Sequence, residues 1–211
     1  KLTKVETEKL GFHRVDDIPG HLAPIIYFDA VKSGNATSLM KILTHNEWDL
    51  LSLITLYIHS TKLLLESMDE SATTLTNIGK WYGDLKHRVR SKEKLADVTE
   101  QFKDEEVATA HYYLALTYKR DGETELALRS FEIASQNTAM RMRENAFLHL
   151  AILYEHKLKD LQKALTMTSA GHAIAEADWH SKSSAKDKRI RDWEIRKKRL
   201  ENKLYFPGKR K

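Results

Sequence analysis

The sequence has 211 residues, 41% of them hydrophobic, which is enough to bury the core of one large domain or two small ones. Its 8 Gly and 3 Pro are too few for an all-β sandwich, so we expect an all-α protein. The net charge of +5 is concentrated near the C-terminus, and the absence of cysteine excludes disulfide frameworks, thiolate zinc sites and cysteine nucleophiles.

The sequence favours a cytoplasmic protein without a membrane partner. Its longest apolar run, Leu50 to Ile58, is far shorter than the roughly 20 residues that a membrane span needs. The first residues lack both an apolar segment and a starting Met, which favours a cut chain end over a signal peptide. A chain without cysteine also fits a reducing compartment.

Residues 1–66 contain signals for three helices. Pro24 and Gly34 bracket the first helix, and Asn35 is a suitable N-cap for a second. A third helix is expected from about Asn46 to Glu66. Apolar residues surround its whole circumference, so we expect it to be buried on most sides and to need packing partners. These residues are Trp48, Leu50, Leu51, Leu53, Ile54, Leu56, Tyr57 and Ile58.

Several short motifs in this segment occur in a recognisable order. They are Gly11-Phe12-His13-Arg14, Asp17-Ile18-Pro19-Gly20, Pro24, Tyr27-Phe28, Gly34 and the run from His45 to Leu53. This order resembles the last third of the ribonuclease H-like exonuclease domain of YprB-type bacterial proteins, in which tetratricopeptide repeats follow. The resemblance implies that residues 1–66 are the C-terminal remnant of such a domain.

The resemblance also implies a role for two residues. In that superfamily four carboxylates (the DEDD type) hold two divalent ions, Mg²⁺ or Mn²⁺, for phosphodiester hydrolysis. The match gives Asp49 the role of a metal ligand, and His45 that of orienting or deprotonating the attacking water. The family's Asp-x-Glu strand and its middle Asp have no counterpart upstream of His45. We therefore expect no tight metal binding and no nuclease activity from this chain alone.

A purely structural role for Asp49 is the alternative. Asn46 would cap the third helix, and Asp49 would reach back to it from the first turn, as in a capping box. There its charge would also meet the positive end of the helix dipole.

The middle of the chain repeats with a period of 36 residues. Leu114 to Tyr118 recurs as Leu150 to Tyr154, and more weakly upstream as Ile78 to Tyr82. Gly122 follows the best copy at a position suited to a tight turn between two helices. The pattern resembles the tetratricopeptide family through His111, Leu114, Ala115, Tyr118, Gly122, Ala127, Phe131 and Ala134.

This resemblance implies helix pairs over residues 72–177. The third copy departs from the pattern, with Leu158 in place of the turn Gly and Lys163 in place of a small residue. The first copy is degenerate, with the charged stretch from Lys86 to Lys94 where its turn should be. Most pattern residues belong to the core, where small side chains let helix axes approach closely.

Function in such arrays resides on the concave face, which the first helix of each pair forms. Residues that we expect to be exposed there and to meet a protein partner are Thr109, His111, Tyr112, Arg143, Asn145 and His149. The alternative is a solvated groove without a ligand.

The C-terminal residues 182–211 hold 13 Lys/Arg against 4 Asp/Glu. Ile190, Trp193, Leu200 and Leu204 form an apolar stripe, which predicts an amphipathic helix over 181–205 that caps the last repeat. Basic residues around the rest of this helix predict weak, nonspecific nucleic-acid binding through phosphate contacts. These residues are Arg189, Arg191, Arg196, Lys198 and Arg199.

Three functions fit these features. The first is the C-terminal scaffold and interaction region of a ribonuclease H-like 3'-5' exonuclease-family protein, inactive as a nuclease by itself. The second is a free-standing tetratricopeptide adaptor that binds a protein partner. The third is a nonspecific nucleic-acid binder that uses its basic C-terminal helix.

Overall fold

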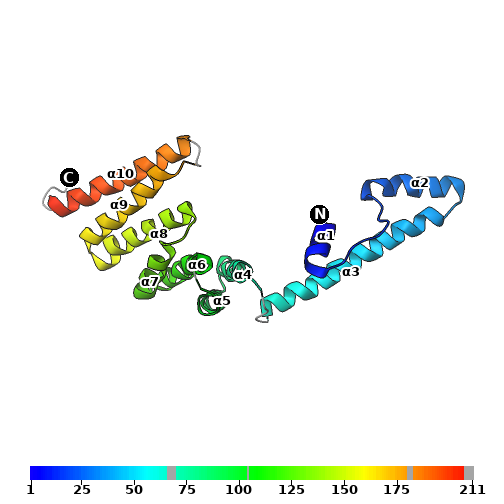
Figure 1. Ribbon diagram of the computed structural model, residues 1–211, viewed down its shortest axis with the longest axis horizontal. Coiled ribbons are helices and arrows are strands. Elements are labelled where there is room, and N and C mark those ends of the chain that lie inside the picture. Colours follow the sequence, from blue (N-terminus) through cyan, green and yellow to red (C-terminus); the bar gives the residue numbers. More distant parts are fainter. Residues whose placement is uncertain (66–69, 104, 180–182, 207–211) are drawn as a thin grey trace. The chain divides into compact units, whose positions relative to one another are not determined.

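The computed structural model describes residues 1–65, 70–103, 105–179 and 183–206. The chain divides into two compact units, residues 1–69 and 70–211. All regular secondary structure in the described residues is helical, with no β-strand among them (Figure 1). The expectation of an all-α protein is confirmed for this part of the chain.

The N-terminal unit is built around a helical hairpin. Pro24 lies in the first turn of the shorter helix, and Gly34 ends this helix with a φ of 67°, a left-handed conformation that suits glycine. Asn35 then accepts a hydrogen bond from the backbone N–H of Thr37. The elements are α1 (Leu2–Val5), η1 (Glu6–Leu10), η2 (Gly20–Leu22), α2 (Ala23–Ser33) and α3 (Thr37–Leu65).

The second and third predicted helices of this unit are one continuous helix. Helix α3 runs for 29 residues, and neither Gly nor Pro interrupts it between Thr37 and Leu65. Asn46 therefore lies inside the helix, and the prediction of a helix start there is wrong. The predicted end at Glu66 lies outside the described residues.

The apolar circumference of α3 is largely exposed within its unit, so the expectation of burial on most sides is wrong there. Among the residues of this helix that the structure describes, only Ser52 is buried. The exposed apolar residues of α3 are Met40, Leu43, Leu50, Leu51, Leu53, Ile54, Tyr57, Ile58 and Leu65.

The C-terminal unit is a succession of helices that pack against their neighbours in sequence (Figure 1). The most extensive contacts join α4 with α5, α6 with α7, α8 with α9, and α9 with α10. The elements are α4 (Ala72–Asp84), α5 (Arg88–Gln101), α6 (Glu105–Asp121), α7 (Thr124–Ala134), α8 (Met140–Leu153), η3 (Tyr154–Leu158), α9 (Leu161–Ala177) and α10 (Ser183–Tyr205).

Left-handed residues mark the turn inside each of the first three helix pairs. They are Lys86 with φ 64°, Gly122 with φ 81° and Lys159 with φ 58°. The first two are one 36-residue period apart, so the degenerate first copy also turns in register. The third turn comes one residue later than the predicted Leu158, because η3 is a π-helical turn that accommodates an extra residue.

Small residues of the repeat lie in the core, as predicted. Ala115, Ala127, Ala134 and Ala151 are fully buried, and Phe131 packs in one cluster with the first three. Helix α10 also packs against the array: its Trp193 and Leu200 are buried, and the Trp193 ring lies directly over Gly171 of α9. The packing of α10 agrees with the predicted amphipathic helix, while the tetratricopeptide assignment stays a prediction.

Among the described residues, no helix is both long enough and apolar enough to cross a membrane.

Candidate functional site

His45 and Asp49 lie one turn apart on α3, on the same face of the helix. The His45 Nε2 atom is 3.4 Å from Asp49 Oδ2. Because α3 begins at Thr37, Asp49 is far from the positive end of the helix dipole and from any N-cap. The capping role considered for Asp49 is therefore wrong.

Arg14 connects this pair to the loop and turn that precede α2. Its Nη2 atom donates to Asp49 Oδ1 at 2.5 Å. The same guanidinium holds Glu6 with two bonds, from Nη2 at 2.5 Å and from Nε at 2.8 Å. Its Nη1 atom donates to Asp17 Oδ2 at 3.2 Å. One cation thus joins three carboxylates that come from η1, the loop and α3.

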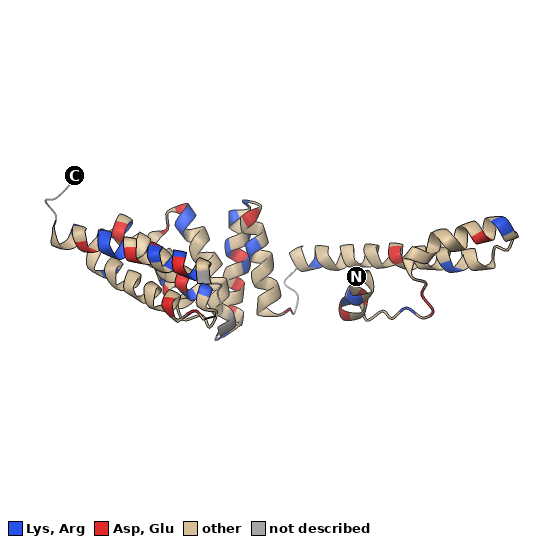
Figure 2. Cartoon of the chain, turned by 90° about the horizontal axis from the view of Figure 1, so that it is seen from above, with Lys and Arg blue, Asp and Glu red and all other residues tan. Residues whose placement is uncertain are grey.

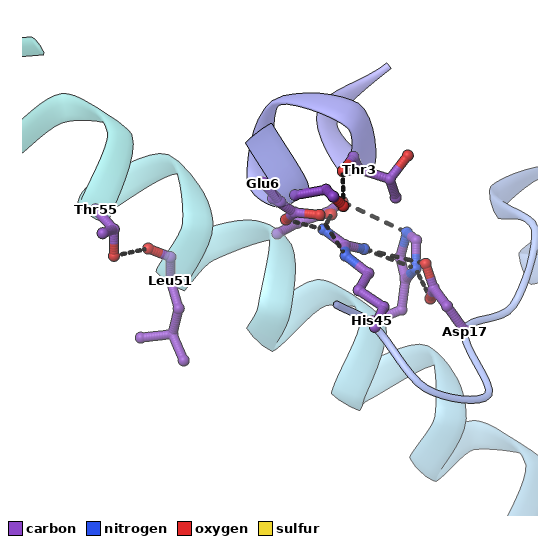
Figure 3. Close-up of polar contacts among 9 residues, drawn as sticks. Thr3, Glu6, Asp17, His45, Leu51 and Thr55 are labelled. Atoms are coloured by element: carbon purple, nitrogen blue, oxygen red, sulfur yellow. Dashed lines mark hydrogen bonds and ion pairs between the residues drawn. The ribbon is translucent and has the colours of Figure 1, made fainter. Parts of the chain in front are cut away.

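Asp17 also contacts His45, with 2.6 Å between Asp17 Oδ1 and His45 Nδ1. Figure 3 shows Glu6, Asp17 and His45 converging from separate segments of the unit. His45 therefore lies between two carboxylates, Asp17 on its Nδ1 side and Asp49 on its Nε2 side. This arrangement fixes the plane of the imidazole ring.

Two carboxylates of this cluster, Glu6 and Asp17, have lowered pKa values. Hydrogen bonding from Arg14 lowers the pKa of Glu6 against the opposing effect of burial, and a hydrogen bond from Ser52 adds to it. Burial raises the pKa of Asp17, but the hydrogen bond and charge of His45, followed by the hydrogen bond and charge of Arg14, outweigh it, and the net shift is downward. The pKa of Arg14 is raised chiefly by its hydrogen bond to Glu6.

The cluster contains three residues to which the sequence gave no functional role: Glu6, Arg14 and Asp17. Glu6 belongs to a charged N-terminal run that carries no helical periodicity, yet its side chain is 0% exposed. Arg14 and Asp17 lie within the motifs of the resemblance, which was the available signal for them.

The residues that the structure describes do not fit a two-metal site by themselves. Among them no group of three or more His, Asp or Glu side chains is arranged to hold a metal ion. Arg14 donates a hydrogen bond to Asp49 Oδ1, and the same guanidinium binds Glu6 and Asp17. The carboxylates of this cluster are directed at a guanidinium group.

The residues predicted to bind a protein partner are partly buried in the helical array. Thr109 accepts a hydrogen bond from Asn137, and Tyr112 packs edge-on against Phe131 with 6.0 Å between ring centroids. Arg143 and Asn145, on α8, are also partly buried. His111 Nδ1 and Arg143 Nε are buried without a hydrogen-bond partner. Partner binding by this group stays a prediction.

His149, the remaining member of that group, stacks on Phe131 at 4.8 Å and lies 3.0 Å from Lys119 Nζ through its Nδ1 atom. Burial, together with the charge of Lys119, lowers the pKa of His149 to about 4. His149 is therefore neutral at pH 7 and accepts a hydrogen bond from Lys119.

Much of the basic charge on α10 is paired with acidic residues of the array, although Lys and Arg are frequent along this helix (Figure 2). Arg189 binds Glu144 and Asp178, while Arg196 and Arg199 bind Glu155. Arg191 and Lys198 are exposed. Three of the five predicted nucleic-acid residues thus attach α10 to the array, and nucleic-acid binding stays a prediction.

Comparison with known proteins gives two matches. The family model of the RNase_H superfamily matches residues 1–61. This range includes all five residues of the cluster around Arg14, which are Glu6, Arg14, Asp17, His45 and Asp49. The "Uncharacterized protein YprB" of Bacillus subtilis (strain 168) is 34% identical over 200 residues, which cover 93% of this chain and 48% of YprB. The chain thus spans about half the length of this curated relative. No solved structure matches it significantly. The chain is thus similar to the RNase_H superfamily over residues 1–61 and to YprB over most of its length.

Proposed function

We propose that this chain is the C-terminal scaffold and interaction region of a longer RNase H-like protein of the 3'-5' exonuclease type, called the parent protein below. The observation that carries the proposal is the adjacency of His45 and Asp49 on α3, inside the segment that the RNase_H superfamily model matches. The length of YprB relative to this chain supports a parent protein with additional residues.

His45 has the surroundings of a general base. With the proton on Nδ1 and donated to Asp17, the Nε2 lone pair faces the edge of the cluster where Asp49 lies. A carboxylate that holds the imidazole in one tautomer in this way orients it for accepting a proton from water. Asp17 is thus a positioning residue for His45.

Asp49 supplies one carboxylate of the proposed site, which is too little for two divalent ions. Two-metal hydrolysis uses several oxygen ligands that converge on ions about 4 Å apart. The other ligands would come from the rest of the parent protein, and Mg²⁺ or Mn²⁺ would bind only in that complete domain. By itself the chain is a non-catalytic part of the nuclease.

The proposal is tested in the parent protein by changing Asp49 to Asn, which retains the shape of the side chain but removes its charge. Metal-dependent cleavage of nucleic acid should fall at least about a hundredfold, the scale known for removal of a single group that stabilises a transition state electrostatically. Asp29→Asn is the matched control, because Asp29 is an exposed carboxylate on α2. Equal cleavage rates for the two variants would refute the nuclease role of α3.

The second candidate, a free-standing adaptor, has support from the helix pairs of the C-terminal unit. Their left-handed turns at Lys86 and Gly122 follow the 36-residue period that resembles tetratricopeptide repeats. An adaptor would bind a protein segment through α6 and α8, which carry the predicted partner residues. Its binding would be insensitive to Asp49→Asn, so the same variant separates the two functions.

A further inference from the structure

The hairpin of α4 and α5, which pack side by side (Figure 1), carries a dense run of positive charge that the proposed function leaves unused. From Lys86 to Lys94 the sequence has five Lys or Arg residues and one acidic residue, Glu93. A solvent-open depression of about 710 Å³ lies there, lined by residues between Lys86 and Glu93. A surface with charge of one sign attracts a polyanion, because binding releases the counterions condensed along it.

Two of the five cations have a structural role. Arg88 Nη1 lies 3.0 Å from Asp121 Oδ1, and Lys92 Nζ lies 2.6 Å from Asp121 Oδ2. Lys92 also binds Glu123. These ion pairs hold α5 against the turn between α6 and α7.

The other three cations, Lys86, Arg90 and Lys94, form no ion pair with a carboxylate of the described residues. Lys86 and Arg90 are exposed, and Lys94 is partly exposed. Because Arg90 and Lys94 are four residues apart in α5, they lie on one face of the helix, about 6 Å apart along its axis. Their charges are therefore available to a ligand.

An exposed indole ring lies close to these cations. Trp81, in the last turn of α4, is 46% exposed. Its ring centroid lies 5.6 Å from that of Tyr82, and the guanidinium carbon of Arg90 lies 5.8 Å from the same Tyr82 ring. Tyr82 is buried, so Trp81 and Arg90 share a fixed neighbour. A flat aromatic face and unpaired cations thus occur together.

We infer that Trp81, Lys86, Arg90 and Lys94, called the α4–α5 surface below, bind single-stranded nucleic acid. Bases of the strand stack on the Trp81 ring, and its phosphates contact the three cations. This combination holds single strands without reading their sequence. A duplex keeps its bases inside, and an acidic protein segment has none to stack. The inference rests on the proposed function for the kind of polyanion, and the surface lies outside the segment that the RNase_H superfamily model matches.

The phosphate contacts are tested by fluorescence anisotropy, with the 211-residue chain and a labelled oligothymidine. Lys86→Gln, Arg90→Gln and Lys94→Gln together should weaken binding at low salt at least about tenfold. They should also reduce the slope of log affinity against log salt by about 2, since each contact with a single strand contributes about 0.7. A triple variant with the affinity and slope of the unmodified chain would overturn the inference, as would an unmodified chain that does not bind.

A matched control removes the same charge from exposed positions elsewhere in the C-terminal unit. It combines Lys103→Gln, Arg129→Gln and Lys157→Gln, and it should leave the salt slope unchanged. An equal loss of slope in this control would mean that binding follows net charge alone, which would overturn the inference.

The stacking contact has a different signature. Trp81→Ala should weaken oligothymidine binding at least about fivefold and leave the salt slope unchanged, because stacking neutralises no phosphate. Binding of a duplex should not respond to this variant. Trp179→Ala, which removes an indole that is 77% exposed, is the control and should leave the affinity unchanged. A Trp81→Ala variant that binds oligothymidine as tightly as the unmodified chain would overturn the inference.

A second measurement does not depend on the folding of a variant. Acetylation of the lysine amines in the unmodified chain should be slowed by oligothymidine at Lys86 and Lys94, but not at Lys103 or Lys157. Protection of Lys198 on α10 in place of Lys86 and Lys94 would overturn the inference. Equal protection by polyglutamate would assign the surface to an acidic protein and overturn it as well. Neither measurement involves cleavage, so failure of the proposed nuclease function would be seen separately.

Discussion

Glu155 illustrates how one buried carboxylate can order a basic helix. Its side chain is 1% exposed and receives Lys203, Arg199 and Arg196 from α10. Burial raises the pKa of Glu155, but the hydrogen bond from Lys203 and the charges of Arg199 and Lys203 outweigh it, so the pKa falls below its usual 4.5. Because its pKa is lower in the folded state, Glu155 stabilises the protein at pH values above its unfolded-state pKa. This stabilisation is lost as the pH falls through the folded-state pKa.

Replacing Glu155 with Gln should therefore destabilise the protein at pH 7, by about 1–3 kcal/mol, since it removes charged hydrogen bonds to three cations. The difference from the unmodified protein should begin to shrink as the pH falls below about 4.5, the unfolded-state pKa of Glu155, and should be lost once the pH is below its lowered folded-state pKa. Urea unfolding at pH 7 and at pH 3 measures both effects. Glu194→Gln, on the exposed side of α10, serves as the control. A pH-independent difference would contradict the assigned ion pairs.

The sequence predicted that His45 and Asp49 lie close together, but it did not predict which other residues contact them. Two residues four positions apart share a helix face, so their proximity follows from periodicity alone. Arg14 reaches Asp49 across 35 residues of chain, and no local pattern encodes which loop residue meets a helix. The same reason explains why the sequence gives Glu6 no functional role.

Ala115 tests the packing of helices α6 and α7. It is fully buried in the cluster that contains Ala127 and Phe131. Ala115→Trp should overpack this contact and lower the free energy of unfolding by about 1–3 kcal/mol, measured by thermal or denaturant melting. Ala115→Gly in the same helix separates loss of helix propensity from overpacking. If the Ala115→Trp variant melts like the unmodified 211-residue chain, the assigned repeat register is incorrect.

Nucleic-acid binding by α10 is best tested at its exposed cations. Deleting residues 181–211, the simplest test, would also remove the buried Trp193 and Leu200. Arg191→Gln with Lys198→Gln should instead weaken binding and reduce the slope of log affinity against log salt by about 0.7–0.9 per lost contact. Fluorescence anisotropy with a labelled oligonucleotide measures the slope. Lys32→Gln with Lys62→Gln is the control, and an unchanged slope in the α10 variant would locate binding elsewhere.

The boundaries of the helices were predictable where Gly or Pro marks them. Pro24, Gly34 and Gly122 gave ends and turns that the structure retains. The expected break before Asn46 does not occur because nothing in Thr37–Leu65 opposes helix propagation, and a good cap residue alone does not start a helix. The one-residue shift from Leu158 to Lys159 depends on a π turn, which the repeat pattern does not reveal.

At the scale of the whole molecule, α3 presents an apolar surface that its own unit leaves uncovered. Leu51 and Ile58 are about half exposed, as are several of their neighbours. Contiguous apolar surface of this kind commonly marks a protein contact. A longer parent protein, as proposed above, offers additional chain that could cover it.

The chain should accordingly bind an apolar fluorescent dye, and Leu51→Gln with Ile58→Gln should reduce the dye signal. Because both side chains are exposed within the unit, stability should change by no more than about 0.5 kcal/mol. Dye titration and thermal melting measure the two quantities. Strong destabilisation with unchanged dye binding would mean that these residues are buried in the isolated chain.

In the proposed function, residues 1–211 carry the His45–Asp49 part of a nuclease site but cannot complete it. The most direct measurement compares metal-dependent cleavage of nucleic acid by the purified chain and by the parent protein, in Mg²⁺ and in Mn²⁺. The purified chain should show no cleavage, and the parent protein should show cleavage that Asp49→Asn removes. Robust cleavage by residues 1–211 alone, unaffected by Asp49→Asn, would contradict it.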